Sequence, residues 1–308
     1  MGLRYETLKR RSKVFRQLTT LTVEEFESLV EKTEPEWKRL EYGRRIRNTE
    51  RKNAIGQGHP YFADFPTLLL LTFYTRTNCV NVLIAVLFGI SEQTVYDLSS
   101  KLLPLLQDRF IPETRLRKKK GRINTLDELL LEYPGLSDVI VDGTDIVTRR
   151  PKRQQKKNYS GKSKRHLKKT VLITNPEDGL ILGRTRLRPG AVHDKRALKE
   201  DSLYRKLERN ASLKKRADSA WTGEDEANGW KVNKRATRGH PLTDEEKTSN
   251  RTLSKVRIKV EHAIRRTKVF RRIGEKTIFR KKGKLAMTLD VAINLANFKQ
   301  LSRHPIGT

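Results

Sequence analysis

The chain has almost no cysteine: Cys79 is the single thiol among 308 residues. One thiol excludes an internal disulfide and any zinc site built from cysteine pairs. Because Cys79 lies among apolar residues, we expect it to be inert core. Long apolar runs are also missing, since the stretches 66–75 and 81–90 fall short of the roughly 20 residues that cross a bilayer. Residues 1–17 are charged throughout, so we expect neither a signal peptide nor a membrane partner.

Acidic residues are scarce, with 36 Asp and Glu against 67 Lys and Arg, which gives a net charge of +31. Such an excess favours a polyanionic partner, either nucleic acid or an anionic membrane surface. A generic basic protein, such as a ribosomal component, is the plainer alternative. The hydrophobic content of 35% and the many apolar runs favour a folded enzyme or regulator. The length allows one large domain or two ordinary ones, and we find no internal repeat.

Residues 1–110 have the pattern of a helical region. Apolar spacing predicts helices over 23–30, 66–74, 80–88 and 91–106, with Thr22 and Ser91 as N-caps. Residues 41–59 are basic and contain glycine, so we expect a loop there. Basic residues 111–135 are predicted to form a linker.

The segment around 66–106 has the spacing of a helix-turn-helix. Ala85 would let two helices approach, Gly89 would make the turn, and Val95 would anchor the second helix. The outer face of that helix would present Glu92, Gln93, Tyr96 and Ser100. We interpret this as a DNA-recognition motif with Gln93 and Tyr96 as candidate contacts, although ordinary helix packing gives the same spacing.

A second domain is predicted over 136–303. Strand patterns cover 138–141, 170–174 and 180–187, with a turn at 175–179. Helical patterns follow over 194–209, 250–273 and 285–303, and Asp194 is placed to cap the first of them. Strands followed by helices indicate an α/β or α+β layer fold.

The segment 149–169 contains eleven Lys or Arg and no acid. Contacts to phosphates supply most non-specific affinity for nucleic acid, so we predict that this segment binds DNA. The candidate contacts are Lys162, Lys164 and Arg165. A solvated, disordered loop is the alternative.

Asp142 and Asp218 are candidate acids of a catalytic site. Asp142 ends the apolar strand 138–141, a position that holds a metal ligand rigidly. The alternative is a turn-forming Asp-Gly pair, and Asp145 competes for the same role. The residues before Asp218, 213–217, are too basic to indicate a buried strand.

Glu261 lies at the edge of an apolar stripe on the helix 250–273. Salt bridges to Arg257 and Arg265, four residues away on either side, are the plainer interpretation. The alternative is that Glu261 faces the end of a strand.

Together these segments resemble DDE transposases. The resemblance rests on 141–144 (Val-Asp-Gly-Thr), 159–162 (Tyr-Ser-Gly-Lys), 189–194 (Pro-Gly-Ala-Val-His-Asp), and Asp218 with Gly223. Arg257, Glu261 and Lys268 match an R-x3-E-x6-K signature, which is similar to bacterial transposases of the insertion-sequence-five type and to Harbinger transposases. Two positions depart from the pattern: Ser254 replaces a tyrosine, and 219–221 (Ser-Ala-Trp) follow Asp218.

The resemblance implies an α/β fold, with an RNase H-like catalytic core preceded by the all-α helix-turn-helix domain. Asp142 would lie on the first, central strand, Asp218 at a later strand end and Glu261 on a following helix. These acids would hold two Mg²⁺ (or Mn²⁺) ions. Lys268 would contact a DNA phosphate, and Arg257 would orient Glu261 or a phosphate. His193 and Asp194 would close an active-site loop, unless Asp194 only caps its helix.

The expected function is that of a transposase. It would bind the terminal inverted repeats of a mobile element in double-stranded DNA, cleave phosphodiester bonds and join the ends to target DNA. We expect a homodimer or a higher assembly, in the cytoplasm and associated with the bacterial nucleoid. The alternatives are a catalytically inactive or domesticated sequence-specific DNA-binding protein, and a general nuclease or RNA-binding protein.

Overall fold

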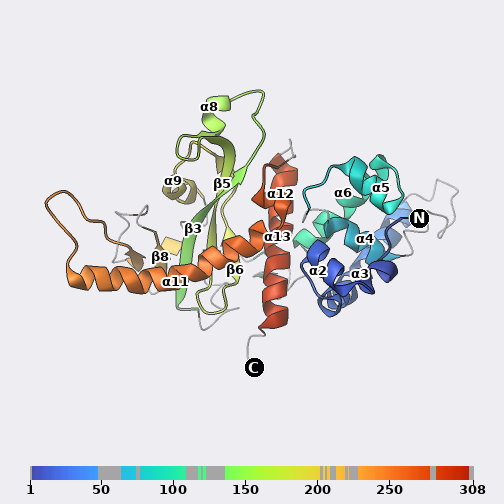
Figure 1. Ribbon diagram of the computed structural model, residues 1–308, viewed down its shortest axis with the longest axis horizontal. Helices are drawn as coiled ribbons and strands as arrows, with labels where there is room; N and C mark the ends of the chain where they lie inside the picture. The colour runs from blue at the N-terminus through green and yellow to red at the C-terminus, as the bar shows by residue number, and fades with distance from the viewer. Residues whose placement is uncertain are drawn as a thin grey trace.

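A lobe of N-terminal helices and a lobe built on a β-sheet lie on opposite sides of one long C-terminal helix, α13 (Figure 1). The computed structural model describes residues 2–47, 64–73, 77–108, 117–118, 121–122, 136–201, 204, 207–208, 213–218, 221, 228–277 and 282–304. The mixed α/β fold expected from the sequence is therefore confirmed.

The N-terminal lobe is helical, as predicted. Thr22 caps α3 in a reciprocal box, since its Oγ1 accepts from the Glu25 amide at 3.2 Å and the Glu25 carboxylate accepts from the Thr22 amide at 2.8 Å. The predicted loop 41–59 is wrong over its first part, because α3 continues to Arg47; residues 48–59 lie outside the described ranges. The helices are α1 Tyr5–Lys9, α2 Ser12–Thr19, α3 Val23–Arg47, α4 Phe65–Thr72, α5 Asn81–Phe88 and α6 Glu92–Asp108.

Helices α5 and α6 meet at a sharp turn. Gly89 takes the left-handed conformation (φ 65°) that caps α5, and the Ser91 hydroxyl accepts from the Thr94 amide at 3.1 Å to cap α6. The two helices are bent by 99°, and Val95 is fully buried. Within the described ranges no single helix is long and apolar enough to cross a membrane, although this bent pair reaches that length and hydropathy together.

A seven-stranded sheet forms the second lobe, in the order β4-β5-β3-β8-β9, with β6 and β7 also paired to β5. The first of these strands in the chain, β3, is central: it runs antiparallel to β5 and parallel to β8. The strands are β3 Asp138–Val147, β4 Tyr159–Ser160, β5 Arg165–Thr174, β6 Ile181–Arg184, β7 Arg188–Pro189, β8 Lys214–Ala217 and β9 Trp230–Val232. Because β3 continues to Val147, Asp142 lies inside the strand and not at its end.

The basic segment 149–169 is folded. It contains the short helix α8 (Gln155–Asn158), strand β4 and the start of β5, so the disordered-loop alternative is wrong. Most of the predicted linker 111–135 lies outside the described residues, apart from the two-stranded antiparallel pair β1 (Arg117–Lys118) and β2 (Gly121–Arg122).

Helices cover the sheet after the strands. Within the range predicted as a helix, 194–209, α9 covers Asp194–Lys199, and the described residues Tyr204, Leu207 and Glu208 are helical again. The N-cap of α9 is His193, not Asp194. The helix predicted over 250–273 is α11 (Asp244–Lys268), which begins at a capping box formed by Thr243 and Glu246. Helices α12 (Arg271–Gly274) and α13 (Lys282–Arg303) follow, and the predicted C-terminal helix is confirmed.

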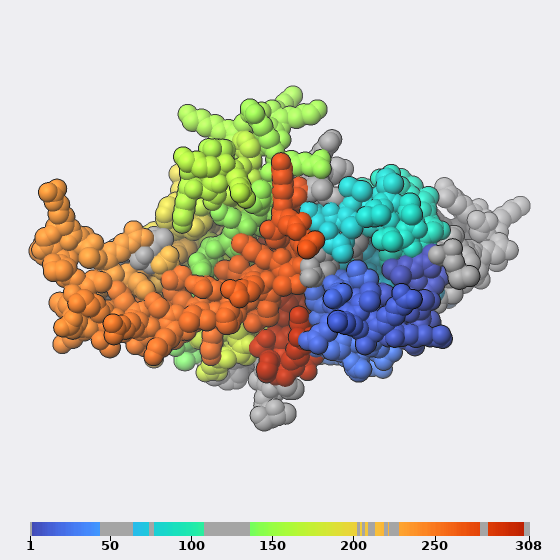
Figure 2. Space-filling model, viewed as in Figure 1, coloured from blue at the N-terminus to red at the C-terminus, as the bar shows by residue number. Residues whose placement is uncertain are grey.

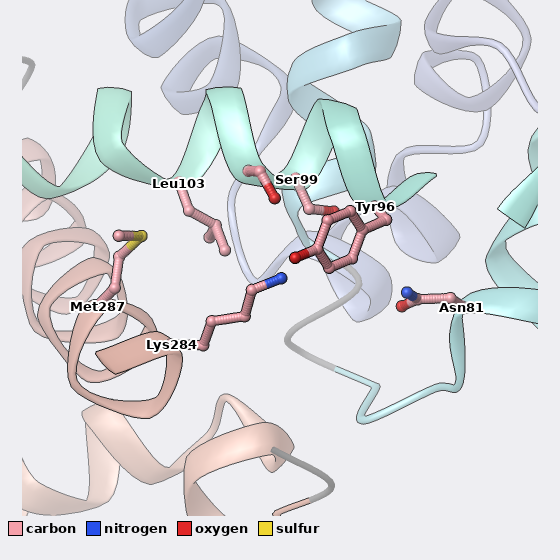
Figure 3. A pocket seen from close by; sticks show the side chains of 7 residues that line it. Asn81, Tyr96, Ser99, Leu103, Lys284 and Met287 are labelled. Atoms are coloured by element: carbon pink, nitrogen blue, oxygen red, sulfur yellow. The ribbon is translucent and has the colours of Figure 1, made fainter. Parts of the chain in front are cut away.

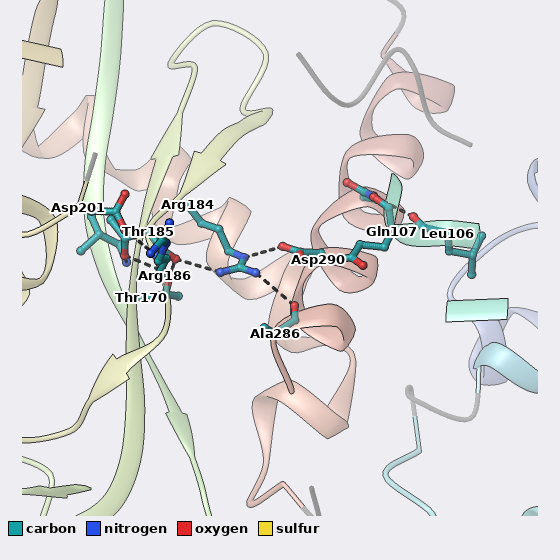
Figure 4. Close-up of polar contacts among 11 residues, drawn as sticks. Leu106, Gln107, Thr170, Arg184, Thr185, Arg186, Asp201, Ala286 and Asp290 are labelled. Atoms are coloured by element: carbon teal, nitrogen blue, oxygen red, sulfur yellow. Dashed lines mark hydrogen bonds and ion pairs between the residues drawn. The ribbon is translucent and has the colours of Figure 1, made fainter. Parts of the chain in front are cut away.

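Polar contacts join the two lobes through α13 (Figure 4). The Asp290 carboxylate on α13 accepts from Arg184 of β6 at 2.5 Å and from Gln107 of α6 at 2.7 Å. Asn294 donates to the backbone oxygens of Leu106 and Gln107. One hydrophobic core likewise runs from the N-terminal helices through α13 to one face of the sheet, and a second core fills the other face.

Candidate active site

Asp142 and Asp218 lie side by side because their strands run in parallel register. Val141 on β3 pairs with Ala217, the last residue of β8, and each aspartate follows its member of this pair directly in the chain. Asp142 is well fixed, since its Oδ1 accepts from the Gly143 amide at 2.8 Å and its side chain is 20% exposed. Asp218 is 39% exposed.

The segment before Asp218 is a strand in spite of its basic composition, so that sequence interpretation is wrong. Lys215 is fully buried, and its ammonium donates to the backbone oxygen of Asn228. Burial lowers the pKa of Lys215, because desolvation disfavours the charged form. Arg216 pairs with Asp138 on β3 at 2.7 Å. Each buried base therefore has a partner, which sequence patterns do not reveal.

Helix α11 carries Arg257 and Glu261, which lie next to these aspartates. Its buried side chains are Leu253, Val260, Ala263 and Thr267, which form the stripe that packs on the protein. At about 100° per residue, Arg257 and Glu261 fall beside this stripe. Glu261 is 58% exposed, so it lies at the rim of the site.

Arg257 stands among all three acids. Its Nη1 lies 3.4 Å from Asp218 Oδ1, and its Nη2 lies 3.8 Å from Asp142 Oδ2 and 4.0 Å from Glu261 Oε1. Charge-assisted hydrogen bonds are usually 2.7–2.9 Å long, so these contacts are loose. The guanidinium thus acts as a shared counter-charge, not as a tight partner of one carboxylate.

Burial shifts two pKa values in the site, and the surrounding charges modify both shifts. Burial raises the pKa of Asp142, the Arg257 charge and the Gly143 amide oppose that rise, and Asp218 and Asp194 add to it. Burial lowers the pKa of Lys268, against the opposing charges of Asp145 and Asp142. Lys268 therefore lies close enough to the aspartates to interact with them electrostatically.

Asp194 approaches the site from the opposite face of β3. A Cβ on Gly143 would lie only 2.7 Å from Asp194 Cγ, so the carboxylate packs directly on the glycine backbone. Asp194 Oδ1 also lies 3.2 Å from Lys169 Nζ. His193 accepts from the Lys195 amide through Nδ1 at 3.3 Å, which gives it the capping role predicted for Asp194.

Two competing interpretations can be compared with the contacts in the structure. Asp145 accepts from Ser163 at 3.1 Å, and its charge acts on Lys268 together with that of Asp142, so Asp145 also lies near the site. Of the two predicted salt bridges of Glu261, the one to Arg257 is present at 4.0 Å. Within the described part of the chain, Arg265 lies beyond salt-bridge distance of Glu261.

The acids supply the oxygen ligands that Mg²⁺ and Mn²⁺ prefer. Among the residues that the structure describes, however, no three acidic, His or Cys side chains are close enough together to hold a metal ion. The Arg257 guanidinium lies between the three carboxylates, at 3.4–4.0 Å from each of them. The carboxylate oxygens therefore fit a divalent metal by donor chemistry alone, without being gathered at coordination distance in the described structure.

The other predicted DNA contacts lie away from the acids. Lys162, Lys164 and Arg165 are exposed at the turn between β4 and β5. Gln93 and Tyr96 are exposed on α6 in the other lobe, where Gln93 donates to Asp97. Tyr96 lines a pocket of about 140 Å³ between α6 and α13 (Figure 3). In this pocket the Lys284 ammonium lies 3.6 Å from the centre of the Tyr96 ring.

Sequence reasoning missed that Arg257 reaches all three acids, because the R-x3-E spacing indicated only that Arg257 and Glu261 share a helix face. The resemblance over 189–194 placed Asp194 in an active-site loop but did not indicate its contact with Gly143, which depends on the absence of a side chain there. Ser254 stands at the position of the signature tyrosine. Its hydroxyl accepts from the Asn233 side chain at 3.2 Å and so links α11 to the segment that follows β9.

The family model described as "DDE superfamily endonuclease" matches residues 141–297, a range that contains Asp142, Asp218 and Glu261. The chain is 34% identical over 151 residues to a protein of Microchaete diplosiphon named "Probable transposase for insertion sequence element IS702". This similarity covers 46% of the chain and 50% of the relative, so the chain spans about half the length of that relative. No solved structure matches the chain.

Proposed function

Because this chain belongs to the DDE superfamily of endonucleases, we propose that it is a DNA transposase of the insertion-sequence-five type. The name of the relative from Microchaete diplosiphon supports the assignment. Asp142, Asp218 and Glu261 are the proposed catalytic acids, and the observation that carries this is their convergence on one guanidinium at 3.4–4.0 Å.

The proposed core is RNase H-like. Its support is the central position of β3, the parallel placement of β8 and the packing of α11 across them. The proposed DNA-recognition motif is the bent pair α5–α6, supported by the 99° bend and the glycine turn. We propose that it recognises the terminal inverted repeats. Holding two ends requires a dimer or a larger assembly, acting on DNA in the cytoplasm.

In the proposed mechanism the three acids would hold two Mg²⁺ or Mn²⁺ ions. When bound, such ions activate the attacking water or 3′-hydroxyl and stabilise the leaving oxygen. The Gly143 amide donates to Asp142 and holds its carboxylate in place on the sheet. Arg257 and Lys268 would bind the phosphate oxygens of the DNA. Lys268 is partly buried, which lowers its pKa, and it lies near Asp145 and Asp142.

Cleavage of DNA that carries the element's ends, measured with Mn²⁺, tests this function. Asp142→Asn and Glu261→Gln are expected to lower the rate at least about 100-fold, since each removes a ligand from the reacting centre. Asp145→Asn is the matched control, because it removes a carboxylate three residues away on the same strand. Full activity in Asp142→Asn together with loss in Asp145→Asn would contradict the assignment. Cleavage by none of the proteins, with end-specific binding retained, would favour an inactive DNA-binding protein.

A further inference from the structure

One face of α11 carries basic side chains that the proposed chemistry does not use. Figures 1 and 2 show this helix lying uncovered across the front of the sheet lobe. We name the α11 basic face after its five exposed members, Arg251, Lys255, Lys259, His262 and Arg265. At about 100° per residue they span a sector roughly 120° wide, on the opposite side from the buried stripe.

These side chains are mostly not engaged within the protein. Lys259 donates to the backbone oxygen of Glu177 at 3.3 Å. Among the described residues, Arg251, Lys255 and Arg265 have no carboxylate within salt-bridge distance. Of the acids at the start of α11, Asp244 pairs with Lys247 at 2.9 Å and Glu246 pairs with Lys234 at 3.3 Å. The face is therefore a row of basic side chains, interrupted by the exposed Ile258, and three of its members have no carboxylate partner among the described residues.

The row is continuous with the acidic site. Arg265 lies about 40° around the helix from Glu261, and the face then extends toward the N-terminus of α11. From Arg251 to Arg265 the helix rises by about 21 Å, at about 1.5 Å per residue. This length equals roughly six base pairs of duplex DNA, at about 3.4 Å each.

We propose that the α11 basic face binds the phosphate backbone of the duplex that flanks the bond cut at the acids. The inference rests on the proposed function and adds to it the path of the DNA. A duplex whose phosphate reaches Arg257 and Glu261 must pass over the rim of α11, where this face begins. Duplex DNA is the partner, because a rigid row of charges matches a regularly spaced polyanion.

The test is the salt dependence of affinity for a plain duplex of arbitrary sequence, measured in EDTA so that no cleavage occurs. The triple variant Arg251→Gln, Lys255→Gln and Arg265→Gln is compared with wild type. Each lost phosphate contact lowers the slope of log K against log salt by about 0.9, so a decrease of about 2 to 3 is expected. The matched control removes the same charge from the other lobe, through exposed residues Arg11, Lys13 and Arg16.

An unchanged slope in the triple variant, or an equal decrease in the control, overturns the proposal. A loss of affinity for duplex RNA without a loss for duplex DNA overturns the choice of partner. A second measurement uses the wild-type protein, so it does not depend on how the variants fold: bound duplex should protect Lys255 from acetylation and leave Lys13 reactive. Because neither assay needs cleavage, a decreased slope in a protein that cleaves no DNA supports this face while refuting the proposed activity.

Discussion

Replacing Arg257 by Gln removes the charge that the three acids share. The guanidinium lies 3.8 Å from the Asp142 carboxylate, and both side chains are under a quarter exposed. At that distance a pair interacts by about 4 kcal/mol at an effective dielectric constant near 20. The desolvation of arginine offsets part of this, and the exposed Asp218 and Glu261 add little. We expect Arg257→Gln to lower the free energy of unfolding by about 2 kcal/mol at neutral pH.

Two conditions should restore stability to this variant. Burial already raises the pKa of Asp142, and losing Arg257 raises that pKa further. A raised pKa of Asp142 means that the folded state binds the proton more tightly than the unfolded chain does. The ionised Asp142 carboxylate therefore destabilises the folded state fully at pH values above its folded pKa. This destabilisation disappears as pH falls below the pKa of the unfolded chain, near 4. Saturating Mn²⁺ should also restore stability, because it replaces the lost positive charge.

Urea unfolding in EDTA and in Mn²⁺, at neutral and acidic pH, measures these effects. The matched control is Arg216→Gln, which breaks a half-buried pair with Asp138 on the same sheet but lies outside the three acids. The control should be destabilised without a response to Mn²⁺. Wild-type stability of Arg257→Gln in EDTA, or an equal Mn²⁺ response in both variants, would refute the shared counter-charge.

Two further substitutions test the packing that positions the site. In Gly143→Val the new Cβ would lie only 2.7 Å from Asp194 Cγ. We therefore expect the free energy of unfolding, measured in urea, to fall by about 1–3 kcal/mol. Gly161→Val, which has open space around its Cβ, should cost much less, and equal losses would contradict the reasoning. Asp290→Asn should cost about 3 kcal/mol by leaving the largely buried Arg184 without its counter-charge, and should speed hydrogen exchange in α6. Unchanged exchange would show that Asp290 does not hold the lobes together.

Local patterns predicted the helices well, because caps and apolar spacing act over a few residues. Thr22, Ser91 and Gly89 each take the role that the sequence indicated. The strand before Asp218 could not be predicted, since its basic residues are stabilised by Asn228 and Asp138 from other segments. The same limit applies to the length of β3, which is fixed by its pairing with β5.

The site was predicted in its members but not in its arrangement. The sequence indicated Asp142, Asp218 and Glu261, and the strand register explains why the first two are neighbours. The capping role of Asp194 was wrong, because its carboxylate is drawn to Lys169 and to the open backbone of Gly143. Such contacts depend on tertiary approach, for which one sequence offers no spacing rule.

The acids differ in how firmly they are held, and this determines which of them can adapt to a metal ion. Asp142 is fixed by its strand and by the Gly143 amide, and Asp218 follows directly on the last residue of β8. Among the described residues, the one ion pair of Glu261 is with Arg257, at 4.0 Å, and the Glu261 side chain is 58% exposed. In the proposed metal-bound state we expect Arg257 and Glu261 on α11 to rotate, while the strands that carry the aspartates stay in place. We therefore predict that metal binding leaves hydrogen exchange in β3 and β8 unchanged.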